Sequence, residues 1–215
     1  MLPAIGMSLA IRRGRLGGAA PASQPFRAAT VFHRLRHLMR APETLMTARL
    51  MLRRPVLGDA ASILESYAGD AEVTRLLAWP RHRSLEDTQS FVRWSDEVWS
   101  GAVAGPYVIL DRGGQLVGST GLDVETLWRA TTGFVLARAA WGRGYATEVA
   151  AAMAQLAGAI GLARLYALCH VENRASAHVL AKAGFAREGV LRRHVLFPNL
   201  DSDLPSDVEC WGHVT

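Results

Sequence analysis

The strongest constraint on the fold is a glycine-containing loop between a predicted strand and a predicted helix. The run Trp141-Gly142-Arg143-Gly144-Tyr145-Ala146-Thr147-Glu148 follows an apolar strand and leads into an alanine-rich helix that ends near Ala159. The amides of a first helical turn have no intrahelical partners and carry partial positive charge, which suits a phosphate group. The two glycines let the backbone approach such a group, and Arg143 adds a charged donor. Taken alone, this pattern is equally consistent with an anion site and with a structural turn.

Two common nucleotide-binding loops are excluded by the residues around this run. A Walker loop needs a Gly-Lys-Ser/Thr sequence, and the only lysine of the chain is Lys182. A Rossmann loop has a third glycine where Thr147 stands, and an acidic residue about 20 positions later. The nearest suitable acid, Glu172, comes too late and lies beyond the next predicted strand. The loop therefore belongs to neither nucleotide fold.

Hydrophobic periodicity and turn residues predict a mixed α/β (α+β) domain. Apolar alternation indicates strands, and helical spacing after Asp59 and after Ser84 indicates helices that these two residues cap. Asp111-Arg112-Gly113-Gly114 is typical of a hairpin turn. The predicted strands are 48–53, 107–110, 116–124, 131–136, 164–169, 187–191 and 207–213, and the helices are 59–67, 84–99, 146–159 and 176–183. This order predicts a sheet of about seven strands with helices on both faces.

Charge separates an N-terminal extension, residues 1–45, from a domain at 46–215. Seven arginines and one acidic residue precede Met46, whereas 17 basic and 18 acidic residues follow from there. The near-neutral domain lacks the basic stripe that nucleic-acid binding needs. Within the extension, apolar spacing predicts an amphipathic helix at 28–40. The extension is interpreted as an overcalled start before Met46, as an accessory docking helix, or as a transit or membrane-surface segment.

The cysteines and the lengths of the apolar runs indicate in which compartment the protein is expected. Cys169 and Cys210 have neither CxxC nor metal-ligand spacing, so no metal site is expected. Two thiols in a chain of this size suit a reducing cytoplasm. No apolar stretch reaches the length of a membrane span, and the longest candidate, 150–162, is typical of a packed helix. A cytoplasmic protein without a transmembrane segment is therefore expected.

Several segments in the right order resemble the GNAT superfamily of N-acetyltransferases. The glycine run at 141–148 is similar to the acetyl-CoA loop of that family, and Thr47 to Arg53 to its opening strand. The pattern Asn173-Arg174-Ala175-Ser176, followed by 179–185 (Val-Leu-Ala-Lys-Ala-Gly-Phe), is similar to a signature of its ribosomal-protein alanine/serine N-terminal acetyltransferases. The resemblance covers residues 46–215. It implies a mostly antiparallel sheet that splays apart between its fourth and fifth strands.

The resemblance implies where acetyl-CoA, the co-substrate, would lie. The pantetheine arm would pair with the backbone of the fourth strand, where one amide would polarise the thioester carbonyl. The loop amides would bind the pyrophosphate, and a polar side chain after the fifth strand would bind the pantetheine amide or an ordered water. The residues expected to bind acetyl-CoA are Phe134, Val135, Leu136, Gly142, Arg143, Gly144, Tyr145, Ala146, Thr147 and Asn173.

The acid and base of the reaction are less well specified than the cofactor loop. Ser176 is the candidate proton donor to the departing thiolate, because the family signature places this hydroxyl near the sulfur; a helix N-terminal serine without chemistry is the alternative. Many relatives carry a tyrosine acid where this chain has Leu180, and several carry a glutamate base where it has Leu168. Glu125 is the candidate base. His170, Glu172 and a water chain are the alternatives.

The expected acceptor is a primary amine, either a protein N-terminus or a small molecule. By analogy with the family it would enter between the break at 79–82 and the connection 197–203. Asp201, Asp203 and Asp207 could attract a cationic amine, or belong to a solvated loop. The alternative function is a non-catalytic acyl-CoA-binding module that docks a partner through its N-terminal helix. A monomer or a homodimer is expected.

Overall fold

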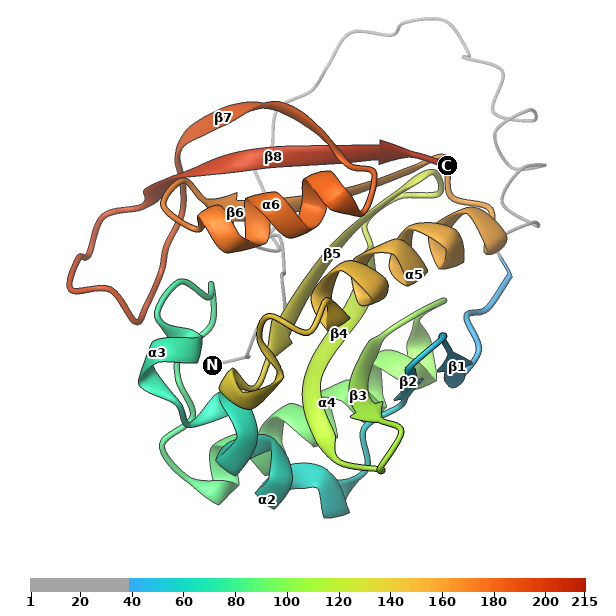
Figure 1. The fold of residues 1–215 in the computed structure, drawn as a ribbon, viewed down its shortest axis with the longest axis vertical. Coiled ribbons are helices and arrows are strands. Elements are labelled where there is room, and N and C mark those ends of the chain that lie inside the picture. The colour runs from blue at the N-terminus through green and yellow to red at the C-terminus, as the bar shows by residue number, and fades with distance from the viewer. Residues whose placement is uncertain (1–38) are drawn as a thin grey trace, which may run out of the picture.

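The computed structural model describes residues 39–215, which form one eight-stranded sheet with helices on both faces (Figure 1). The strand order is β1-β2-β3-β4-β5-β6-β8-β7, and every neighbouring pair is antiparallel except β5 and β6. The strands are β1 (Thr44–Met46), β2 (Leu50–Arg53), β3 (Pro106–Asp111), β4 (Leu116–Val124), β5 (Arg129–Leu136), β6 (Arg164–His170), β7 (Ala186–Val195) and β8 (Ser206–Val214). The predicted mixed, mostly antiparallel sheet is confirmed.

The helices of the described residues flank the sheet. The α-helices are α2 (Ala60–Ile63), α3 (Ala71–Thr74), α4 (Leu85–Gly101), α5 (Tyr145–Ala159) and α6 (Arg174–Lys182). Short turns of other helix types are η2 (Leu57–Asp59), η3 (Leu64–Ala68) and η4 (Arg138–Ala140). The predicted helix at 84–99 begins as expected, because Ser84 and Asp87 form a reciprocal capping box. The helix predicted from Ser176 begins two residues earlier, because Asn173 caps it.

The sheet has one strand more than predicted, at its N-terminal edge. Thr47 follows β1 and turns the chain, since its backbone amide donates to the carbonyl of Leu50 and its hydroxyl oxygen accepts the amide of Leu50. β1 then pairs antiparallel with β2. The strand predicted at 48–53 was therefore too long at its start: residues 47–49 form a hairpin turn, and the alternating pattern spans that turn.

The predicted helix at 59–67 is divided into three pieces, η2, α2 and the π-helical η3. The expected side-chain cap from Asp59 is wrong. Its carboxylate instead accepts both terminal nitrogens of Arg53 at 2.7 Å and the amide of Val56 at 2.8 Å. A charge-assisted bidentate pair is stronger than a single helix cap, so the carboxylate of Asp59 pairs with Arg53 of β2 and does not cap the helix.

Two apolar layers cover the two faces of the sheet. On one face α5 packs through Val149 and Met153 against residues such as Leu122 of β4. On the other face α2 and α4 pack against residues such as Val108 and Val135. Each fully buried side chain of this size contributes about 1.5–3 kcal/mol. The sheet is therefore fixed from both sides in its N-terminal half.

Residues 39–45 contact the rest of the domain. Ala41 is buried, its amide donates to the carbonyl of Val103, and the hydroxyl of Tyr107 donates to the carbonyl of Pro42. The extension before residue 39 lies outside the described residues, and so does the helix predicted at 28–40 except for its last two positions, which are not helical. Within residues 39–215, no helix is long and apolar enough to span a membrane.

Candidate functional site

Strands β5 and β6 separate from each other, as Figure 1 shows. They pair in parallel only over 129–131 and 164–166, although β5 continues to Leu136 and β6 to His170. The separated halves leave the outer edge of β5 without a strand partner on this side. Backbone polar groups at such an edge are available to a ligand. The splay therefore creates a place where an extended group can pair with β5.

The amides of Phe134 and Leu136 face this opening. The amide of Ala137 donates to Val117 on β4 at 2.8 Å, and the backbone groups of a strand alternate in direction from one residue to the next. Those of Phe134 and Leu136 consequently point away from β4. The carbonyl of Leu136 accepts the indole hydrogen of Trp141 at 2.9 Å. Its amide hydrogen remains for a ligand.

The glycine loop adopts the conformation that only glycine takes without strain. Gly142 and Gly144 have φ values of 72° and 74°, and the stretch from Trp141 to Gly144 is exposed. Gly144 immediately precedes α5, whose first-turn amides point out of the helix. Within residues 39–215, the amides from Gly142 to Thr147 find no partner outside α5. The loop therefore fits a pyrophosphate.

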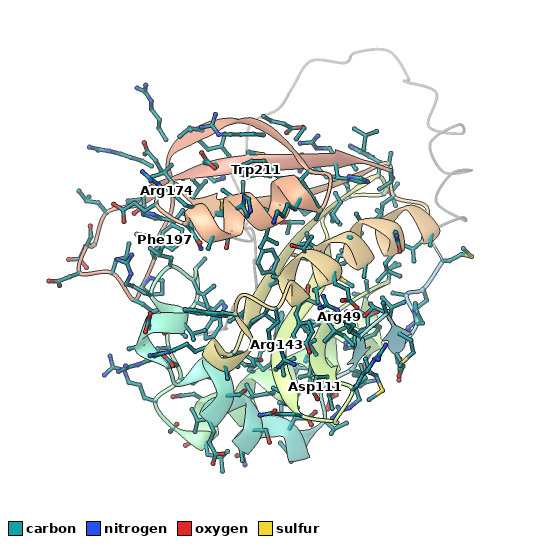
Figure 2. The ribbon with its side chains drawn as sticks, in the orientation of Figure 1. Arg49, Asp111, Arg143, Arg174, Phe197 and Trp211 are labelled. Atoms are coloured by element: carbon teal, nitrogen blue, oxygen red, sulfur yellow. The ribbon has the colours of Figure 1, made fainter. Side chains whose placement is uncertain are left out.

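Arg49 was missed by the sequence analysis and lies against the loop. Its Nη1 donates to the carbonyl of Arg143 at 2.7 Å, and its guanidinium lies 4.8 Å from the ring centre of Tyr145. The guanidinium of Arg143 lies 4.7 Å from the same ring. Figure 2 shows the two arginines close to the start of α5. Two positive charges therefore border the loop, where the sequence analysis expected one.

Glu148 holds Arg49 in this position. Its Oε1 accepts the hydroxyl of Thr47 at 2.6 Å and the amide of Arg49 at 2.7 Å, and its Oε2 accepts Nε of Arg49 at 2.7 Å. Partial burial acts to raise the pKa of Glu148, but these hydrogen bonds outweigh burial and lower it below its ordinary value. An ionised, fully bonded carboxylate is a structural tether between the first hairpin and α5.

The side chains expected at the cofactor differ in their orientation. Val135 is packed against the α2 and α4 face and its backbone groups point towards β4, so it offers a ligand neither side chain nor amide. Tyr145 is 6 % exposed and offers its backbone alone. Ala146 and Thr147 are half-buried on the first turn of α5. The side chain of Arg143 borders the loop, as described above. The loop itself would therefore contact a ligand chiefly through its backbone.

Asn173 and Ser176 lie together at the start of α6. The side-chain oxygen of Asn173 accepts the amide of Ser176 at 3.1 Å, which is an N-cap contact. Asn173 follows the open end of β6, and both residues are half-buried. The side-chain nitrogen of Asn173 and the hydroxyl of Ser176 make no hydrogen bond within residues 39–215. The capping contact leaves both groups available to a ligand.

Glu125 is not brought to this opening. It follows β4 next to Arg129, at the end where β5 and β6 are still paired. Its carboxylate accepts Nε of Arg129 at 2.8 Å and the hydroxyl of Tyr166 at 2.5 Å. Burial first, and the hydrogen bond to Glu125 second, raise the pKa of Tyr166. Glu125 is therefore engaged at the closed end of the sheet.

His170 does lie at the open end, but its ring is held by neighbours. Its Nδ1 accepts the amide of Glu172 at 3.1 Å, which places the hydrogen of the neutral ring on Nε2. The ring packs edge-on against Phe197, with centroids 4.8 Å apart. Glu172 itself is exposed. In this arrangement Nδ1 of His170 is occupied and is not free to accept a proton from an amine.

The two segments expected to border the acceptor lie side by side, as Figure 1 shows for α3 and the β7–β8 connection. Asn199 joins them: its side chain accepts the amide of Arg81 and donates to the carbonyls of Thr74 and Trp79, each at 2.8 Å. Phe197 is buried at the base of the same connection, labelled in Figure 2. Both segments are predicted from the sequence, whereas the contact made by Asn199 is visible only in the fold.

The three aspartates near this connection differ. Asp201 and Asp203 are exposed, whereas the carboxylate of Asp207 accepts the amide of Arg193 at 2.8 Å. Asp207 therefore stabilises the irregular end of β7. The two exposed aspartates face solvent at the tip of the connection.

Comparison with known families gives a direct match over most of the domain. Residues 49–186 match the family described as "Acetyltransferase (GNAT) domain". The chain is also 30 % identical over 155 residues to the uncharacterized N-acetyltransferase YoaA of Bacillus subtilis, covering 70 % of this chain and 87 % of that protein.

Solved structures share the fold at lower sequence identity. The microcin C7 self-immunity acetyltransferase MccE, solved with acetyl-CoA and AMP, has a TM-score of 0.72 and 20 % identity, over 84 % of this chain and 99 % of that one. RimL, a ribosomal L7/L12 N-terminal acetyltransferase solved with coenzyme A, has a TM-score of 0.70 and 20 % identity, over 80 % and 98 %. At this identity the likeness concerns the fold.

Proposed function

Because the chain belongs to the GNAT family, and is thus an N-acetyltransferase that uses acetyl-CoA, we propose that it acetylates a primary amine by direct attack in a ternary complex. The acceptor is a protein N-terminus or a small-molecule amine. The observation that carries the proposal is the separation of β5 from β6 beside the glycine loop. A thioester lying along β5 would be open to an amine on the face opposite α5.

Different parts of the site would bind different parts of acetyl-CoA. The amides from Gly142 to Thr147 would bind the pyrophosphate, with Arg49 and Arg143 supplying positive charge. The amide of Phe134 or Leu136 would donate to the thioester carbonyl and stabilise the oxyanion as the amine attacks. Such donors are fixed by the strand before the reaction, so their alignment costs no reorganisation.

Proton transfers complete the reaction. The amine nitrogen bonds to the carbonyl carbon, the carbon–sulfur bond breaks, and the amine loses one proton while the thiolate gains one. Ser176 would donate to the sulfur, since it lies in the first turn of α6, after the open end of β6, and its hydroxyl makes no hydrogen bond within residues 39–215. Glu125 is bonded by Arg129 and Tyr166, and Nδ1 of His170 is occupied. We therefore assign removal of the amine proton to water.

A screen for released thiol tests the proposal. The full-length protein and acetyl-CoA are offered N-terminal peptides and small amines, and free coenzyme A is measured together with the mass of the acceptor. The expected result is coenzyme A release coupled to an acceptor mass gain of one acetyl group. Binding of acetyl-CoA without acceptor-dependent release across the panel would instead support a non-catalytic acyl-CoA-binding module.

A further inference from the structure

A cavity lies on the α4 face of the sheet, apart from the glycine loop. Its volume is about 270 Å³, and it is bordered by the second half of α4 and by parts of β4 and β5. The residues that line it carry two charges, Glu97 and Asp123, and both are negative. Trp94 adds an aromatic side chain. Anionic and aromatic groups together are the chemistry that binds organic cations.

Asp123 is the central group of this cavity. It stands directly opposite Thr131 in the β4–β5 pair, so both side chains are on the same face of the sheet. Its carboxylate makes no hydrogen bond or ion pair within residues 39–215. Burial, and then the nearby charge of Glu125, raise its pKa above the ordinary value. An ionised, half-buried carboxylate without a partner loses hydration, which lowers the stability of the free protein. A bound cation compensates for this loss.

Thr131 provides an independent sign of a ligand. The residue is 3 % exposed and lines the cavity, yet its hydroxyl has no hydrogen-bond partner in the described part of the chain. The adjacent Thr132, by contrast, donates its hydroxyl to the carbonyl of Gly121 at 2.8 Å. The fully buried side-chain oxygens without a partner in the described residues are those of Ser66 and Ser95, so the Thr131 hydroxyl keeps some exposure to the cavity. This unpaired hydroxyl adjoins the unpaired carboxylate.

The cavity lies beside the proposed reaction path. Thr131 is the last residue of β5 that pairs with β6, and the opening starts at the next residue. Three residues of strand, about 10 Å, separate Thr131 from Phe134, whose amide faces the opening. The cavity is on the sheet face opposite α5. The acceptor would enter on that same face.

We propose that Asp123, with Thr131, Trp94 and Glu97, binds a second ammonium group of the acceptor. Asp123 supplies the charge, the Thr131 hydroxyl accepts a hydrogen from the ammonium, and the Trp94 ring faces its methylenes. The preferred acceptor is then a cation at both ends, such as a polyamine. This inference specifies the acceptor of the proposed function, and it rests on that function and on entry of the acceptor from the face opposite α5.

Calorimetric titration of the full-length protein tests the site without requiring turnover. The probes are spermidine, putrescine and butylamine at low ionic strength, because exposed charge interactions weaken with salt. Wild-type protein should bind spermidine and putrescine at least about tenfold more tightly than butylamine. Asp123→Asn should remove that difference, and Thr131→Val, which keeps the shape, should reduce it. Glu86→Gln, on the same helix but outside the cavity, should leave it unchanged.

Three outcomes would overturn the site: no binding of either spermidine or putrescine, equally tight binding of butylamine, or unaltered binding by Asp123→Asn. A titration with peptides distinguishes a polyamine from a lysine side chain as the source of the ammonium group. Ala-Lys and Ala-norleucine peptides suit this purpose, because they differ only in the terminal cation of the side chain. A preference for the lysine peptide without spermidine binding would contradict the polyamine preference. Diamine binding that depends on Asp123, without any acetylation, would retain the site and reject the proposed function.

Discussion

Arg49 and Glu148, 99 positions apart, are joined by two hydrogen bonds of 2.7 Å, one from the side chain and one from the backbone of the arginine. This contact ties the first hairpin to the first turn of α5. The same guanidinium reaches the carbonyl of Arg143 in the glycine loop. The conformation of the loop therefore depends on a residue far from it in sequence.

Replacing Arg49 by alanine should weaken acetyl-CoA binding about tenfold, or 1.4 kcal/mol. The variant loses a positive charge beside the loop and the hydrogen bond to the Arg143 carbonyl. Lysine should restore only part of the affinity, because it cannot bridge Glu148 and the carbonyl at once. Calorimetric titration of acetyl-CoA measures the effect. Arg93→Ala is the control, since Arg93 is exposed and within residues 39–215 its side chain donates to Ser90 on its own helix. An equal loss in both variants would contradict the role of Arg49.

Gly144→Asp should reduce acetyl-CoA affinity by about 100-fold, close to 2.7 kcal/mol. The substitution forces a side chain into a left-handed conformation, which costs about 1–2 kcal/mol, and places a negative charge where the pyrophosphate would bind. Gly114→Asp is a matched control, because Gly114 has a φ of 77°, similar to the 74° of Gly144, in a distant exposed turn. Unchanged affinity in Gly144→Asp would reject the loop as the phosphate site.

Asn199→Ala should separate acceptor binding from cofactor binding. The variant leaves the carbonyls of Thr74 and Trp79 and the amide of Arg81 without their partner. Each lost bond of this kind costs about 1–3 kcal/mol where it is buried, so the Tm should fall by several degrees. Steady-state kinetics should show a higher KM for the amine with the Kd for acetyl-CoA unaltered. A matching rise in both constants would contradict a role on the acceptor side.

The sequence predicted those parts of the structure that depend on local pattern. The hairpin at 107–124, the capping box at Ser84 and the strand–glycine–helix junction at Gly144 each carry their signal within a few residues. The splay between β5 and β6 came from the family resemblance, because no periodicity in a single chain reports where two strands separate.

The features that escaped prediction are contacts between distant residues. Arg49 and Asn199 look like ordinary polar residues of a turn and a loop, and only the fold brings them to α5 and to the 74–81 segment. Glu125 was chosen because it ends a strand near the expected site. Its partner Tyr166, 41 positions later, could not be inferred from spacing, and this partner is what engages the carboxylate.

Removal of residues 1–45 should lower stability relative to removal of residues 1–38. The longer deletion takes away the buried Ala41, the Pro42 carbonyl that accepts from Tyr107, and two of the three residues of β1. An unpaired buried hydroxyl alone costs about 1–3 kcal/mol. Thermal melts of the two truncations measure the difference. Equal melting temperatures would indicate that these contacts contribute nothing to stability.

Asp123→Asn should raise the Tm at neutral pH, and the gain should shrink as the pH falls towards 4. The pKa of Asp123 is raised in the folded protein by burial and by Glu125, so the native state binds this proton more tightly than the unfolded chain does. Stability is consequently lost as the pH rises from the unfolded value, near 3.9, through the folded one. Asparagine stays neutral and avoids that loss.

Thermal melts of wild type, Asp123→Asn and Glu86→Gln between pH 4 and pH 8 measure this effect. Glu86 is exposed, so its substitution should give no gain that depends on pH. A gain for Asp123→Asn that disappears when spermidine is added to both proteins would connect the stability cost to the ligand, because the bound cation stabilises only the carboxylate form. A lower Tm for Asp123→Asn throughout the range would mean that the carboxylate already has a stabilising partner within the protein, and the cavity would then lack the unpaired charge that makes it a cation site.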